Sequence, residues 1–193
     1  SRDCGWIQIY SENAQEAYDN MLMAHRIAED PRVQLPVMVC QDGFITSHAV
    51  ENIVLEDDST VKDFVGEYRP EHFLLNPSQP AAFGPYGISA YYMELKKQQT
   101  EAMDRAGAVI QNVSEAFGSL TGRYYDLIER YRMDDAKLAV VCIGSSAGTG
   151  KDAVDQLRQQ GIQAGLVKIR VFRPFPGKEI AAALSKVEAV GIM

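Results

Sequence analysis

The chain has 193 residues and a formal net charge of −7, a length that allows one large domain or two modest ones. Its apolar fraction of 46% and its charged fraction of 23% are ordinary for a globular protein. The acidic balance argues against a nucleic-acid partner, because phosphate binding requires a basic surface. No apolar run approaches the length of a membrane span and no signal-peptide pattern opens the chain, so we expect no membrane partner.

The first half of the sequence predicts an α/β unit. Residues 6–10 alternate like a half-buried strand, a helix follows over about 14–29, and residues 35–40 form a strand parallel to the first. The loop over residues 41–48 leaves that strand at its carboxyl end, where doubly wound sheets bind ligands. A short helix near residues 59–65 lies in a long irregular stretch, residues 56–87, and a long helix covers about 89–117.

The second half predicts a parallel sheet. Strands are expected over residues 137–143, 165–171 and 187–193, with helices over 151–160 and 178–185. This β-α-β-α-β order favours right-handed crossovers within one sheet. Because the sequence opens almost at once in a strand and stops within another, we expect a piece of a larger subunit; a naturally short protein with strand termini is the alternative.

The three cysteines, Cys4, Cys40 and Cys142, are far apart and odd in number. Such usage indicates reduced thiols in a cytoplasmic protein, with Cys40 and Cys142 expected in the core. The sequence has no Cys-x-x-Cys motif. We therefore expect neither an iron–sulfur cluster nor a structural zinc ion held by this chain alone.

A glycine-rich segment, residues 144–152, lies between a predicted strand and a predicted helix and resembles a phosphate-binding loop. The glycine spacing is one residue too long, and Asp152 stands where a hydroxyl residue would bind magnesium. A structural turn is the favoured interpretation, and nucleotide binding at this turn is kept as an alternative.

Other candidate residues are few. Arg2 could pair with a substrate carboxylate through both edges of its guanidinium group, although a solvated terminal arginine is the simpler interpretation. His48 could carry a proton or, more simply, order its loop through a backbone hydrogen bond. No set of residues makes a self-sufficient catalyst, so no catalytic residue is assigned. Arginine and aromatic side chains at the end of the strand predicted over residues 165–171 indicate an interface: Arg170, Phe172, Arg173 and Phe175.

Four segments resemble the alpha subunit of pyruvate:ferredoxin oxidoreductase, in that family's order and along nearly the whole chain. They are residues 2–8 (Arg-Asp-Cys-Gly-Trp-Ile-Gln), 42–48 (Asp-Gly-Phe-Ile-Thr-Ser-His), 120–125 (Leu-Thr-Gly-Arg-Tyr-Tyr) and 168–176 (Lys-Ile-Arg-Val-Phe-Arg-Pro-Phe-Pro). Cys4 stands where the family usually has threonine. The resemblance implies that Arg2 helps to bind the substrate carboxylate.

The resemblance also implies an α/β fold in two parts. Residues 1–119 would be the later part of the domain that contacts the pyrimidine ring of thiamine diphosphate, with the loop 56–87 and the long helix at about 89–117. Residues 120–193 would begin a parallel β/α domain like the C-terminal domain of transketolase. The glutamate that activates the thiamine ring would lie upstream of this segment.

The implied enzyme converts a 2-oxoacid and coenzyme A to acyl-CoA and carbon dioxide, and it reduces ferredoxin. Pyruvate is the 2-oxoacid that the resemblance favours. Thiamine diphosphate with Mg²⁺ would be shared with a partner subunit, and the iron–sulfur clusters would lie on other subunits of a cytoplasmic oligomer. The chain alone would be inactive. Two alternatives remain, a docking module that binds no ligand and an enzyme of the same family that acts on another 2-oxoacid.

Overall fold

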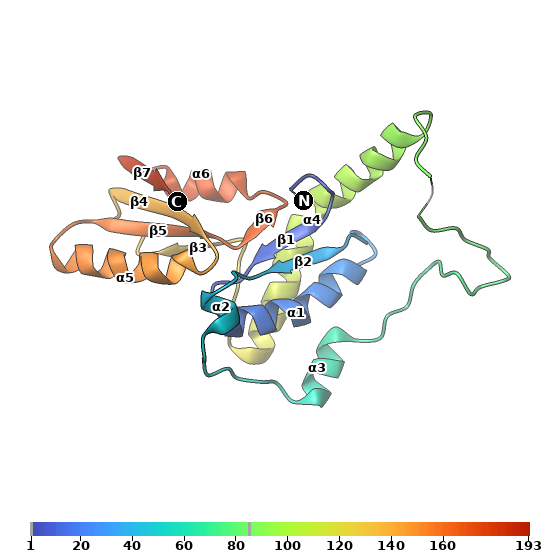
Figure 1. Ribbon diagram of the computed structural model, residues 1–193, viewed down its shortest axis with the longest axis horizontal. Helices are drawn as coiled ribbons and strands as arrows, with labels where there is room; N and C mark the ends of the chain where they lie inside the picture. Colours follow the sequence, from blue (N-terminus) through green and yellow to red (C-terminus); the bar gives the residue numbers. More distant parts are fainter. Residues whose placement is uncertain (1, 85) are drawn as a thin grey trace.

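The structure, a computed structural model, describes residues 2–84 and 86–193. Its strands form two sheets, one of three strands and one of four (Figure 1). Helices alternate with the strands along the chain, so the fold is α/β, as the sequence predicts.

None of the helices in these two ranges is both long and apolar enough to cross a membrane.

The first sheet has the strand order β2-β1-β6. Strand β1 (Ile7–Tyr10) runs parallel to β2 (Val37–Cys40), as predicted, and α1 (Ala14–Glu29) connects them. Asn13 caps α1, because its side-chain oxygen accepts a hydrogen bond from the Glu16 amide at 2.9 Å. The apolar face of α1 and the long helix α4 (Tyr92–Thr121) close the core over β1.

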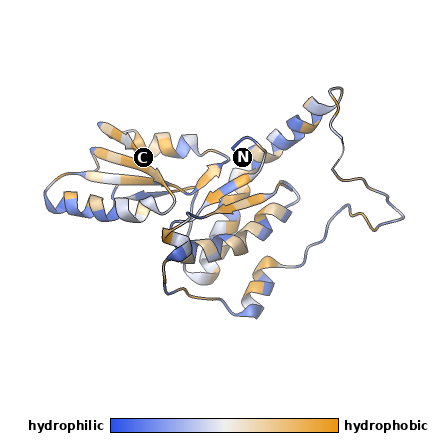
Figure 2. Ribbon diagram, viewed as in Figure 1, coloured by the Kyte–Doolittle hydropathy of each residue, from blue (hydrophilic) through white to orange (hydrophobic). Residues whose placement is uncertain are grey.

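The second sheet has the order β3-β5-β4-β7, from β3 (Ile128–Tyr131), β4 (Leu138–Ile143), β5 (Ala164–Ile169) and β7 (Ala189–Ile192). Strands β4, β5 and β7 are parallel, as predicted, whereas β3 was not predicted and pairs antiparallel with β5. Helices α5 (Ser146–Gln159) and α6 (Gly177–Leu184) pack into separate apolar clusters on the sheet. Figure 2 shows hydrophobic strands beside the hydrophilic outer face of α5.

The chain returns to the first sheet after β5. The strand predicted over residues 165–171 ends at Ile169, and β6 (Val171–Arg173) pairs antiparallel with β1 instead. A single strand through residue 171 is thus wrong, because residue 170 turns the backbone from one sheet to the other. The proposed domain boundary between residues 119 and 120 falls in the last turn of α4, and the division into two domains stays a proposal.

Two loops also contain more helix than the sequence predicts. The short helix α2 (Ile45–His48) occupies the loop after β2, where the Asp42 carboxylate accepts hydrogen bonds from the amides of Phe44 and Thr46. Helix α5 begins five residues before the predicted Lys151, because Gly144, at a φ of 67°, turns the chain directly after β4. The cysteines are free thiols, with Cys142 buried, Cys40 half-buried and Cys4 exposed.

Helix α3 (Asp58–Val65) packs against α1, and an extended segment then leads from it to α4. This segment and the first turns of α4 project away from both sheets (Figure 1).

Candidate functional site

A carboxylate held between two arginines lies at the start of the chain. Asp3 Oδ2 accepts hydrogen bonds from Arg2 Nε at 3.0 Å and Arg2 Nη2 at 2.7 Å. The other oxygen, Oδ1, accepts from Arg173 Nη2 at 3.0 Å. We call these three residues the arginine clamp. It brings together Arg2, predicted to bind substrate, and Arg173, predicted to lie at an interface.

Strand pairing builds the clamp. Because β6 runs antiparallel to β1, with Arg173 opposite Gln8, the end of β6 meets the segment that precedes β1. Arg173 Nε also donates to the backbone carbonyl of Arg2 at 3.1 Å. The contact spans nearly the full length of the chain, so spacing in the sequence could not reveal it.

The clamp opens into a cavity of about 400 Å³ between the start of the chain, β6 and α4. Three cationic side chains (Arg2, Lys96 and Arg173) and two carboxylates (Asp3 and Asp104) line it. Lys96 is held by its neighbour on the helix, because its Nζ donates to Gln99 Oε1 at 2.8 Å. With these groups ionised, the lining carries one net positive charge, which suits a single anionic group.

The ionisation of the clamp follows from its hydrogen bonds. Hydrogen bonds from Arg2 hold the pKa of the Asp3 carboxyl below its usual value, and the pKa of Arg2 is raised in return. Both side chains are exposed, so solvent screens the pair and its contribution to stability is small. The clamp can therefore exchange one carboxylate for another at little cost in folding.

A second polar cluster is buried where the two sheets meet. Lys168 of β5 is 2% exposed, and its Nζ lies 2.7 Å from Glu12 Oε2, 2.7 Å from Glu16 Oε1 and 2.6 Å from Glu129 Oε2. Burial alone would lower the pKa of Lys168, but the three carboxylates outweigh it and the pKa is raised. Lys151 adds a second cation, 2.8 Å from Glu12 and 2.7 Å from Glu129.

This cluster was missed in the sequence. Its only signal is a lysine inside the otherwise apolar strand β5, which demands a buried anion. The three glutamates are close enough together to hold a metal ion. The Lys168 ammonium already binds each of them, however, so this donor set does not fit Mg²⁺.

Comparison with known proteins gives these sites a context. Residues 1–115 match the family described as "Pyruvate flavodoxin/ferredoxin oxidoreductase, thiamine diP-bdg", and residues 136–193 match "Pyruvate:ferredoxin oxidoreductase core domain II". The chain belongs to the pyruvate:ferredoxin oxidoreductase family. The resemblance seen in the sequence is therefore confirmed.

Curated members of the pyruvate:ferredoxin oxidoreductase family align along the entire chain. It is 45% identical over 192 residues to pyruvate synthase subunit PorA of Pyrococcus horikoshii and 43% identical over 194 residues to the PorA of Methanocaldococcus jannaschii. It is 39% identical over 200 residues to the alpha subunit of NADH-dependent phenylglyoxylate dehydrogenase of Aromatoleum evansii. The chain covers 49%, 50% and 48% of these proteins respectively, about half of their length.

A solved structure supports the fold. A 2-oxoglutarate:ferredoxin oxidoreductase from Magnetococcus marinus, with 2-oxoglutarate, coenzyme A and succinyl-CoA bound, superposes with a TM-score of 0.62. The match covers 97% of this chain and 34% of that chain at 14% sequence identity, so it bears on the fold alone.

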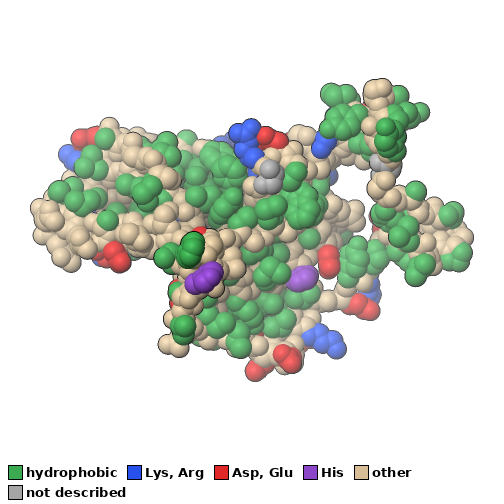
Figure 3. All heavy atoms as spheres, in the orientation of Figure 1, with side chains coloured by type: hydrophobic (Ala, Val, Ile, Leu, Met, Phe, Trp, Pro, Cys, Tyr) green, Lys and Arg blue, Asp and Glu red, His purple; other side chains and the backbone are tan. Residues whose placement is uncertain are grey.

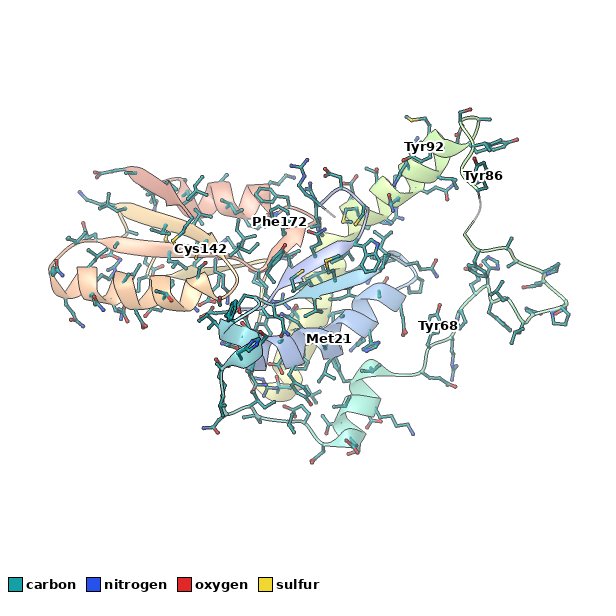
Figure 4. All side chains as sticks on the ribbon, in the orientation of Figure 1. Met21, Tyr68, Tyr86, Tyr92, Cys142 and Phe172 are labelled. Atoms are coloured by element: carbon teal, nitrogen blue, oxygen red, sulfur yellow. The ribbon has the colours of Figure 1, made fainter. Side chains whose placement is uncertain are left out.

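The four residues predicted to form an interface differ in their burial and in their partners. Arg170 is 1% exposed, and its guanidinium group donates to Asn20 Oδ1 and to the Asp126 carbonyl within the chain. Phe172 packs edge-on against Phe175, with 6.0 Å between ring centroids, and Phe175 is exposed. Figure 4 shows Phe172 near the junction of the two sheets. Arg170 therefore joins elements of this chain, and an interface is proposed only for the other three residues.

His48 and the glycine-rich segment differ from their predictions. His48 lies in α2, stacked on Phe44, and its Nδ1 is 2.7 Å from Ser47 Oγ, so a side chain rather than the backbone is its partner. Gly148 and Lys151 lie inside α5, and Lys151 is bound by two glutamates. A helical segment with an engaged lysine does not form a phosphate-binding loop, which removes the basis for nucleotide binding there.

Proposed function

We propose that the chain is part of the alpha subunit of a thiamine-diphosphate-dependent 2-oxoacid:ferredoxin oxidoreductase that acts on pyruvate. The complete cytoplasmic enzyme would form acetyl-CoA and carbon dioxide and reduce ferredoxin. In this proposal Arg2 binds the carboxylate of the 2-oxoacid. The arginine clamp is the observation that carries the proposal, because Arg2 and Arg173 together bind a carboxylate, that of Asp3.

The chemistry of the clamp suits a 2-oxoacid. Arginine presents several N–H donors in a plane and pairs with carboxylates through two parallel hydrogen bonds. Asp3 uses one edge of Arg2 and a single nitrogen of the Arg173 fork, so N–H groups remain for an incoming carboxylate. These side chains would bind and orient the substrate, and no catalytic role is proposed for them.

The cofactors are proposed to depend on other parts of the enzyme. The candidate carboxylate set for Mg²⁺ among the described residues is already bound by Lys168 and Lys151, so the metal–diphosphate site is proposed for another subunit. The iron–sulfur clusters are proposed for other subunits too, since this sequence has only three well-separated cysteines. Relatives named as subunits support a multi-subunit complex. The 193-residue chain alone is therefore expected to leave a redox dye unreduced when pyruvate, coenzyme A, thiamine diphosphate and Mg²⁺ are added.

The test is steady-state kinetics on the intact subunit assembled with its partners. Arg2→Ala should raise the KM for pyruvate about tenfold or more, because a charge-assisted pair of hydrogen bonds is lost. Arg2→Lys should give a KM between those of the wild type and Arg2→Ala, because lysine keeps the charge but not the paired N–H donors. Arg32→Ala is the matched control, since Arg32 forms a similar exposed pair with Asp30 at 2.7 Å. An unchanged KM in Arg2→Ala would remove this arginine from the site.

A second substrate deserves a direct comparison. The chain is 39% identical to the alpha subunit of an enzyme whose name specifies phenylglyoxylate, against 45% and 43% for two pyruvate synthase subunits. Both substrates are 2-oxoacids with one carboxylate, so the clamp alone does not separate them. Pyruvate is the proposed substrate, and a higher kcat/KM with phenylglyoxylate would assign the chain to the alternative.

A further inference from the structure

The extended segment before α4 and the first turn of that helix form an apolar projection. We call residues 72–95 the arm; its described part is 72–84 and 86–95. Residues 72–93 contain no Asp, Glu, Lys or Arg, although the chain as a whole is 23% charged. A long loop in a soluble chain is ordinarily polar, so a surface segment without charge needs an explanation.

Large apolar side chains on the arm face solvent. Leu75 is 89% exposed and Tyr86 is 90% exposed. Figure 3 shows hydrophobic side chains gathered on the projecting part of the molecule, and Figure 4 places Tyr86 and Tyr92 there. The other exposed members are Phe73, Leu74, Phe83, Ile88, Tyr91, Met93 and Leu95.

The described backbone hydrogen bonds of the arm are local. Asn76 donates to Phe73, Gln79 to Asn76, and Tyr91 to Ile88. Among the described residues of the arm, His72 and Phe83 line a hollow with residues 34–36, which directly precede β2. Little of the apolar surface of residues 72–84 and 86–95 is therefore buried against the rest of this chain.

The exposed area is large enough for a stable interface. With about 150–250 Å² available from each aromatic side chain, the arm exposes apolar area on the order of 1,000 Å². A standard protein interface takes about 800 Å² from each partner. Tyrosine, phenylalanine and methionine are also the residues that concentrate at the centres of such interfaces.

We propose that the arm docks into an uncharged apolar groove on a different subunit of the oxidoreductase complex. Nucleic acid or an anionic membrane would require basic groups, and the stretch 72–93 has no Lys or Arg. Two copies of this chain, each with a net charge of −7, repel one another, which favours a non-identical partner. The identity of that partner rests on the proposed function, because the enzyme complex supplies the other subunits.

The experiment uses the full-length subunit with its partner subunits. The double variant Leu75→Ser, Tyr86→Ser should weaken their association at least about tenfold, since a central apolar contact is worth that factor or more, as measured by sedimentation. Met21→Ser is the control, because Met21 is 50% exposed on α1, away from the arm (Figure 4). The circular dichroism of the double variant should remain that of the wild type, because both side chains face solvent.

Hydrogen exchange supplies the second measurement. The amides of residues 72–84 and 86–95 should exchange more slowly in the complex than in the isolated subunit. Equal exchange in both states, or an isolated subunit that dimerises through the arm, would overturn the proposal. Arg2→Ala should raise the KM for pyruvate while leaving assembly intact, so a failure of the substrate assignment and a failure of the docking assignment give different results.

Discussion

The ammonium group of Lys168 lies 2.7 Å from the carboxylate of Glu16, and this pair joins β5 of the second sheet to α1 of the first. Glu16 also accepts a hydrogen bond from the Glu12 amide at 2.7 Å, just before α1 begins. The ion pair thus connects the start of one helix to a strand far away in the sequence. It makes the junction between the two sheets dependent on charge as well as apolar packing.

Removing the buried cation should destabilise the protein strongly. Lys168→Met leaves Glu12, Glu16 and Glu129 with one fewer partner, and loss of one member of a buried ion pair costs about 3–5 kcal/mol. Urea denaturation of the subunit measures the change. Lys137→Met is the control, because its pair with Glu188 at 3.3 Å is exposed and is worth about 1 kcal/mol or less. Equal losses in the two variants would contradict the structural role of the cluster.

The same cluster should make stability depend on acid pH. Burial would raise the pKa of Glu129, but hydrogen bonds from Lys151 and Lys168 prevail and hold it below its usual 4.5. A carboxyl group with a lowered pKa in the folded state contributes stability that is complete above its unfolded value and lost as the pH falls through its folded value. The free energy of unfolding should therefore decrease below about pH 4.5, and Glu129→Gln should reduce that slope. Urea denaturation at a series of pH values around and below 4.5 measures this dependence. If the free energy of unfolding fell equally steeply with pH in the wild type and in Glu129→Gln, the role of Glu129 would be contradicted.

Periodicity predicts the elements whose partners are close in the sequence. The helix expected over 14–29 is α1 at those bounds, because its cap, its apolar stripe and its end are all encoded locally. Strand β3 was missed because its short sequence, Ile-Glu-Arg-Tyr, is interrupted by charged residues, and the partner of Glu129, Lys168, lies far away in the sequence. The turn from β5 into β6 was missed because the pairing with β1 is a long-range contact.

The residues of the candidate site also differ in whether the sequence alone could identify them. Arg2 was proposed through resemblance, whereas its neighbour Arg173 is brought beside it by the pairing of β6 with β1 and has no local signal of that role. Arg170 belongs to the group of arginine and aromatic residues that predicted an interface, yet its side chain is buried within the chain and donates a hydrogen bond to Asn20 of α1. Pattern identifies residues that need a partner, but the tertiary fold decides which partner each one receives.

Asp3 should compete with substrate at the arginine clamp. Asp3→Asn removes the charge that Arg2 and Arg173 share, so the KM for pyruvate in the assembled enzyme should fall, by about fivefold at most because the pair is exposed. Asp30→Asn, beside Arg32, is the matched control. A higher KM in Asp3→Asn would mean instead that Asp3 holds the arginines in their productive positions.

A glycine in the second sheet should tolerate no side chain. A Cβ atom at Gly165 would lie 2.6 Å from Met133 Sδ and 2.9 Å from the carbonyl oxygen of Arg132, so the backbone would have to move. Gly165→Ala should cost about 1–3 kcal/mol, equivalent to a fall in Tm of about 2–4 °C per kcal/mol for a chain of this size. Gly43→Ala is the control, because a Cβ there meets no atom within 4 Å. Thermal denaturation should leave Gly43→Ala near the wild type, and a Gly165→Ala protein with the wild-type Tm would show that β5 and the turn before β4 are less closely packed than the structure indicates.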